Sequence, residues 1–162
     1  MKPLKILFVL CIMLGFALPA NSQGKQVERP FKGIFYAHVT KAGPIEELAI
    51  NGNATHVGNF TGKMYFDHSS LKVGPNGEIL DVTISGTIVA ANGDEIEFGP
   101  DNPGMKFNNF PIDLSTGTMS ADINLNPGTG RFANCSGVIT TTGIFDMGND
   151  YAMWTAEGWI KY

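Results

Sequence analysis

Apolar and polar residues alternate one by one along most of the chain from residue 30 onward. Residues 30–40 place Phe31 and Phe35 in one register and Lys32 and His38 in the other. No long stretch of this region has the three-and-four spacing of an amphipathic helix. A period of two is typical of β-strands with one buried face. The pattern therefore predicts an all-β domain.

The alternation predicts about seven to nine strands, joined mostly by short turns. After the first, the expected strands cover residues 55–67, 78–91, 94–99, 117–126, 136–146 and 151–162. Residues 110–114 are a candidate short strand, and residues 42–53 fit either a helical turn or a strand. Residues 100–111 are rich in Pro, Gly and Asn, which predicts a long loop.

The longest alternating segment, residues 78–91, is followed at once by Asn92-Gly93. Its expected inward face begins at Leu80 and continues through Val82 and Ile84. Asn-Gly between two alternating segments is a strong hairpin signal, because both central residues of a type I′ turn need positive φ. We therefore expect a hairpin with a two-residue turn.

Glycines recur inside the predicted strands, mostly in the register of the large apolar residues. They are Gly33, Gly62, Gly86, Gly143 and Gly158. Glycine inside a strand allows tight coiling or close approach of packed backbone. Closing the sheet also removes the edge strands that a long apolar sheet would expose. We therefore expect a single antiparallel closed or nearly closed barrel of about eight strands rather than a sandwich.

Residues 1–22 have the three parts of a secretory signal. Two lysines precede an apolar run of 13 residues from Ile6 to Leu18, and small residues follow at positions 20–22. Such a run is shorter than the roughly 20 residues that span a bilayer. We expect cleavage before Gln23, a mature barrel domain of residues 23–162, and a secreted or periplasmic location.

The predicted mature chain is mildly acidic. Removal of Lys2 and Lys5 leaves 9 basic residues against 15 acidic ones, a net charge of −6 with neutral histidines. The chain contains no basic run. Because nucleic acids and anionic membranes attract basic surfaces, we expect no nucleic-acid partner and no membrane binding after cleavage.

Cys135 is the only cysteine of the predicted mature chain, so no internal disulfide can form. We interpret it as a small buried hydrophobe, with a reactive thiol or a link between two chains as the alternatives. Glycosylation sequons occur at Asn53, Asn59 and Asn134, and they matter only if the host glycosylates exported proteins.

The segment Gly128-Thr-Gly-Arg-Phe-Ala-Asn-Cys-Ser-Gly137 is a glycine-framed turn between two alternating segments. It resembles the Gly-Thr-Gly-x-Phe-x-x-Ala-x-Gly turn of allene oxide cyclase and dirigent-like barrels, including uncharacterised bacterial exported relatives. Residues 55–61 and 91–94 resemble companion motifs of that bacterial branch. Cys135 stands where the pattern usually has alanine. The resemblance implies the barrel fold, but no working residue of the plant members, which steer cyclisation or radical coupling of apolar molecules, matches a position here.

The same turn can be interpreted from its residues alone. Gly130 can take a positive φ, residues 131–133 can form one helical turn, and Phe132 can plug the end of the barrel. We therefore expect the segment to be part of the barrel's construction rather than a catalytic site.

Candidate chemistry is sparse. The chain has three histidines, His38, His56 and His68. None has the spacing of a metal ligand pair, so we expect no metal and no cofactor. Glu95 and Glu97 lie roughly 6 to 7 Å apart on one strand face, similar to the carboxylates of some hydrolases, but alternation places them outward.

Three functions remain open. The first is an exported barrel that binds a small apolar ligand inside or another protein outside. The second is a cyclase or isomerase in which Tyr36, His56 and Tyr65 converge on an apolar substrate in one cavity. The third is a structural or self-associating protein with an apolar outer patch around Trp154 or Trp159. Without a recognisable catalytic set, the sequence favours a binding protein over an enzyme.

Overall fold

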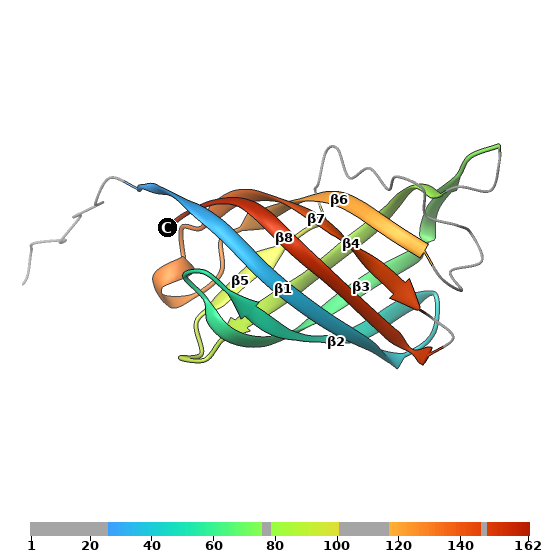
Figure 1. Ribbon diagram of the computed structural model, residues 1–162, viewed down its shortest axis with the longest axis horizontal. Helices are drawn as coiled ribbons and strands as arrows, with labels where there is room; N and C mark the ends of the chain where they lie inside the picture. Colours follow the sequence, from blue (N-terminus) through green and yellow to red (C-terminus); the bar gives the residue numbers. More distant parts are fainter. Residues whose placement is uncertain (1–25, 76–78, 101–116, 147–148) are drawn as a thin grey trace, which may run out of the picture.

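The computed structural model shows a single closed antiparallel β-barrel of eight strands (Figure 1). It describes residues 26–75, 79–100, 117–146 and 149–162. The strands are β1 (Glu28–Lys41), β2 (Ile45–Ala54), β3 (Gly58–Val73), β4 (Ile79–Ala90), β5 (Glu95–Phe98), β6 (Gly117–Asn126), β7 (Ser136–Asp146) and β8 (Tyr151–Lys161). Each strand pairs with the next along the chain, and β8 closes the barrel on β1. The predicted fold class is confirmed.

Alternation sends every second side chain of a strand into the barrel. In β1, Phe31 and Phe35 are buried while Tyr36 is exposed. In β8, Trp154 is buried, and Trp159, of opposite parity, lies partly exposed on the outer wall. Burying a large apolar side chain contributes about 1.5 to 3 kcal/mol, so the alternate positions hold the barrel together.

The ambiguous segment at residues 42–53 forms strand β2. Leu48 and Ile50 point into the barrel and are nearly inaccessible to solvent. Their backbone positions pair with Met64 and Gly62 of β3, and the other edge of β2 pairs with β1. Hydrogen-bonded pairing on both edges therefore makes this segment a strand. Its short local pattern alone does not distinguish a strand from a helical turn.

The glycines inside the strands mark close backbone approaches, as predicted. A Cβ atom on Gly62 would lie 2.1 Å from the carbonyl oxygen of Thr87 on the neighbouring strand. A Cβ atom on Gly158 would lie 2.1 Å from the carbonyl oxygen of Val138. No side chain fits at these distances. Glycine at these positions therefore allows the sheet to coil tightly enough to close.

The hairpin at Asn92-Gly93 is confirmed, but the predicted two-residue turn is wrong. The Gly93 N–H donates to the Ala90 carbonyl at 2.9 Å, and the Ala90 N–H donates to the Asp94 carbonyl at 2.9 Å. Residues 91–93 therefore form a three-residue loop, in which Gly93 has a φ of +85°. This loop needs only one residue of positive φ, whereas a type I′ turn would also require it of Asn92.

The expected inward position of Leu80 is also wrong. Its side chain is 49% exposed, and Ile79 is buried instead. Lys72 pairs with Asp81 and Val73 pairs with Ile79, so Leu80 is an extra residue without a partner across the ladder. Such a β-bulge reverses the parity of the residues beyond it, which local alternation does not reveal.

Some predicted segments fall outside the described residues. These are the secretory signal at residues 1–22, most of the loop at residues 100–111 and the candidate strand at residues 110–114. In the described part of the chain, no helix is long and apolar enough to cross a membrane.

Candidate functional site

The three motifs that carry the family resemblance meet at one end of the barrel. They form the β2–β3 turn, the β4–β5 turn and the connection between β6 and β7, which contains the 3-10 helix η2 (Gly130–Phe132). In Figure 1 these turns gather at the end where the chain terminates. We call this region the capped end.

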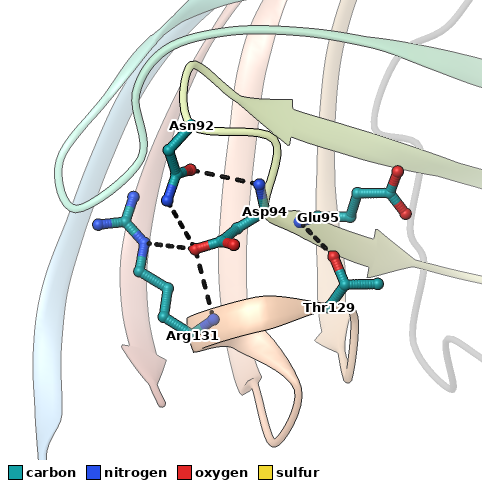
Figure 2. Close-up of polar contacts among 5 residues, drawn as sticks. All are labelled: Asn92, Asp94, Glu95, Thr129 and Arg131. Atoms are coloured by element: carbon teal, nitrogen blue, oxygen red, sulfur yellow. Dashed lines mark hydrogen bonds and ion pairs between the residues drawn. The ribbon is translucent and has the colours of Figure 1, made fainter.

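Asp94 ties two of these turns together (Figure 2). Its carboxylate accepts hydrogen bonds from the Asn92 side-chain amide at 2.8 Å and from the Arg131 backbone N–H at 3.3 Å. The same oxygen lies 3.5 Å from Nε of Arg131. Beside this contact, the Glu95 N–H donates to Oγ1 of Thr129 at 3.0 Å. These contacts fasten the hairpin to η2 and explain the cluster as part of the construction of the barrel end.

Phe132 fills the capped end, as its place in the glycine-framed turn predicts. Its side chain is completely buried, and its ring meets that of Tyr162 edge-on with the centroids 5.1 Å apart. Gly130 has the expected positive φ, at +54°. The turn thus delivers an aromatic plug to the barrel end.

His56 lies at the rim of the capped end. Its Nε2 is 3.0 Å from the carbonyl oxygen of Pro30, so this nitrogen carries the proton and donates the hydrogen bond. Its ring centroid is 6.0 Å from that of Tyr162, whose ring also lies 5.3 Å from the guanidinium of Arg29. With a φ of +68°, His56 takes a turn conformation that few residues other than glycine adopt. Its contacts are those of a turn residue that anchors the rim.

Tyr36 and Tyr65 lie on the outer wall. Tyr36 is 39% exposed on β1. Tyr65 is half-buried on β3, where its neighbours across the ladders are Glu47 and Ser85. The structure therefore does not bring these two tyrosines together with His56, and none of the three lines the small cavity inside the barrel.

The barrel interior holds a cavity of only about 20 Å³. Its walls are apolar except for Thr141, whose hydroxyl donates to the carbonyl of Ala121 at 3.0 Å. A space of this size accommodates about one water molecule, and a water would need two or more polar partners. Where the described residues line it, the interior is thus a packed core without room for an organic ligand.

The described residues offer little metal-binding or acid–base chemistry. Among them, no three His, Cys, Asp or Glu side chains lie close enough to hold a metal ion. Glu97 is exposed and Glu95 is partly exposed, so both face outward as alternation predicts.

Cys135 is the buried hydrophobe that the sequence suggests. Its side chain is 1% exposed and lies in the core near the capped end. Burial raises the pKa of its thiol to about 11 because the thiolate would lose its hydration. The thiolate is the reactive form of cysteine, so both access and ionisation disfavour reaction.

The Cys135 thiol is therefore expected to resist alkylation in the folded protein. For the chain that begins at Gln23, iodoacetamide at pH 8 should modify the native form at least roughly a hundredfold more slowly than the urea-unfolded form. Intact-mass spectrometry over time measures both rates. Rapid stoichiometric labelling of the native barrel would contradict the buried position.

The outer wall contains an uncharged face that the sequence does not reveal. It consists of two adjacent rows of outward residues across β2, β1, β8, β7 and β6. The rows are Asn51, Tyr36, Met153, Ile144 and Thr118, and Asn53, Ile34, Thr155, Thr142 and Ser120. Ile34 and Ile144 are 46% and 44% exposed. The self-associating hypothesis expects an apolar outer patch around Trp154 or Trp159; Trp154 points inward, and Trp159 is partly exposed on the outer wall.

By contrast, the outer wall of β3 and β4 carries ion pairs. Lys63 forms an ion pair with Glu47 at 2.7 Å, and Lys72 forms one with Asp81 at 2.6 Å. The uncharged face is therefore a local feature of the barrel surface and not its general character.

Comparisons of the chain with protein-family models, curated proteins and solved structures find no match. The architecture that the structure shows, a small closed antiparallel barrel of eight strands, is thus the level at which this protein is classified.

Proposed function

We propose that this protein is an exported binding module that recognises another protein through its outer wall. The observation that carries the proposal is the packing of the interior that the described residues line, where a cavity of about 20 Å³ leaves no space for an organic ligand. A barrel of eight strands is either filled by its own side chains or holds one small ligand. The described interior is of the first kind, which favours binding at the outer surface.

The uncharged face shares two features with protein interfaces, the lack of charged residues and the presence of an aromatic residue and a methionine. The cores of such interfaces are depleted of charged residues and enriched in aromatic residues and methionine. Tyr36, Met153 and Ile144 lie side by side on β1, β8 and β7 in this face. Their partial exposure leaves apolar area for a partner to cover.

The cyclase or isomerase hypothesis has no comparable support. It requires Tyr36, His56 and Tyr65 to converge on one cavity, whereas two of them occupy the outer wall and the third anchors a turn. The interior cavity is also smaller than any apolar substrate of that class would need.

We also propose kinship with the allene oxide cyclase and dirigent-like barrels. The closed barrel of eight strands agrees with that superfamily, and the three resembling motifs meet at the capped end. The proposed kinship is one of fold and not of activity, because the residues of these motifs contribute to packing and turn geometry.

Export follows from the leader-like sequence of residues 1–22. Expression of the full chain in a secreting bacterial host is expected to yield protein outside the cytoplasm whose N-terminus is Gln23. N-terminal sequencing checks the cleavage position, and retention of the whole chain in the cytoplasm would contradict the proposed export.

Two measurements on the exported protein test the binding mode. Native mass spectrometry should give the mass of the mature chain without a stoichiometric small molecule. A photo-crosslinking residue in place of Met153 should give protein adducts in the producing host, whereas the same residue in place of Thr87 should not. Thr87 is the control because it lies on the outer wall between Lys63 and Glu97. An organic molecule bound one to one, or equal adducts from both sites, would overturn the proposal.

A further inference from the structure

A pair of opposite charges borders the uncharged face. Lys32 of β1 and Glu157 of β8 are direct neighbours across the ladder, with Nζ and Oε1 3.2 Å apart. Their side chains are 67% and 70% exposed, so the pair lies open to solvent. An exposed pair of this kind contributes little to folding, which leaves both charges available to a partner.

We propose that a second copy of this chain binds the uncharged face, with a two-fold axis that runs parallel to the strands between β1 and β8. The proposal rests on the proposed function and names the partner. Under this symmetry, a residue of β1 faces the residue of the second copy's β8 that is its neighbour within one barrel. Lys32 then faces Glu157 of the second copy, and Tyr36 faces Met153 of the second copy.

Charge complementarity selects this axis. A two-fold contact places the same surface patch of both copies together, so the patch must complement itself. An axis along β1 would place the two Lys32 side chains against each other, and an axis along β8 would do so for the two Glu157 side chains. With the axis between these strands, Lys32 of each copy faces Glu157 of the other. The two equivalent contacts favour association and fix the register of the two copies.

The wall is hollowed at the position of the proposed axis. A shallow depression of about 290 Å³ lies on the outer wall over β2, β1 and β8. Lys32, Ile34, Asn53, Thr155 and Glu157 are among its lining residues. Because the depression spans the proposed axis, the depressions of the two copies face each other, and the Lys32 and Glu157 side chains that line them have room to reach across the axis.

The size of the uncharged face sets the expected affinity of the dimer. A standard stable interface uses roughly 20 to 30 residues a side, more than the two rows and their charged border supply. We therefore expect a reversible dimer whose dissociation constant lies in the micromolar range, on the order of 10 to 100 µM.

Sedimentation velocity of the chain that begins at Gln23 tests the dimer over a range from about 5 to 500 µM, which brackets that dissociation constant. Lys32→Glu and Glu157→Lys are each expected to raise the dissociation constant roughly tenfold or more, because each places like charges across the axis. The double variant with both changes should restore dimerisation, because it only exchanges the two charges. Lys72→Glu is the matched control, since Lys72 is as exposed as Lys32 and also pairs with a carboxylate, but lies outside the face.

The possible results separate this inference from the function on which it rests. Unchanged association in both single variants, or no rescue by the double variant, would overturn the proposed axis. A chain that stays monomeric throughout would overturn the dimer, while crosslinking from position 153 to a different protein would leave the binding function standing. A small molecule found inside the barrel would remove that function without changing the sedimentation result. Circular dichroism confirms that every variant is folded.

Discussion

Replacing Phe132 by alanine is expected to lower the free energy of unfolding by about 3 to 5 kcal/mol. The ring is completely buried at the capped end and packs edge-on against Tyr162. Its removal leaves a cavity whose walls the rigid barrel cannot bring together, so the loss includes both transfer and cavity contributions. Urea unfolding followed by tryptophan fluorescence measures the change, because Trp154 reports from the core.

Phe132→Leu separates the role of volume from that of backbone geometry. Leucine retains most of the buried apolar area, so we expect a loss below about 2 kcal/mol. The backbone of residue 132 accepts hydrogen bonds from Gly128 and Cys135, and both variants keep these groups. If alanine and leucine gave equal small losses, the plug would not contribute to the closure of the barrel end.

Most of the barrel could be predicted from sequence because burial on one face imposes a period of two. This period located the strands, the inward faces and the outward direction of Glu95 and Glu97. It failed at Leu80, where a bulge opposite the β3 ladder adds a residue. It also could not identify β2, because Glu46 and Glu47 interrupt a short segment whose state depends on pairing with two distant strands.

The capped end could be predicted only in part. The glycine frame indicated the turn and the plug, since these depend on residues close in sequence. The contact of Asp94 with Arg131 joins residues 37 positions apart, so no local pattern reveals it. The uncharged face is still harder to predict from sequence, because its ten residues become neighbours only through the register of five strands.

Different parts of the barrel have different roles. The resembling motifs supply closure, through Asp94, Phe132 and the turn around His56. The outer wall of β1, β8 and β7 supplies the surface on which a partner can bind. Variants of the capped end should therefore change stability, whereas variants of the uncharged face should change association at constant stability.

Gly128→Ala is expected to destabilise the barrel by roughly 3 kcal/mol or more, or to prevent its folding. A Cβ atom at this position would lie 1.9 Å from the carbonyl oxygen of Glu95 and 2.6 Å from its carbonyl carbon. The same oxygen accepts a hydrogen bond from the Thr129 N–H at 3.0 Å. The added methyl group must push the turn away from β5, which breaks this bond and the adjacent Asp94 contact with Arg131. Urea unfolding and the yield of soluble monomer measure the result.

Gly58→Ala is the matched control for backbone strain without a clash. Gly58 has a φ of +75°, and a Cβ atom there would meet nothing within 4 Å. Its replacement should cost only the roughly 1 to 2 kcal/mol of placing an L-residue in the left-handed region. Gly128 has no such φ, so its larger expected loss comes from contact with β5 alone. A Gly128→Ala barrel as stable as Gly58→Ala would mean that the glycine-framed turn does not rest on β5, and that the capped end closes by other contacts.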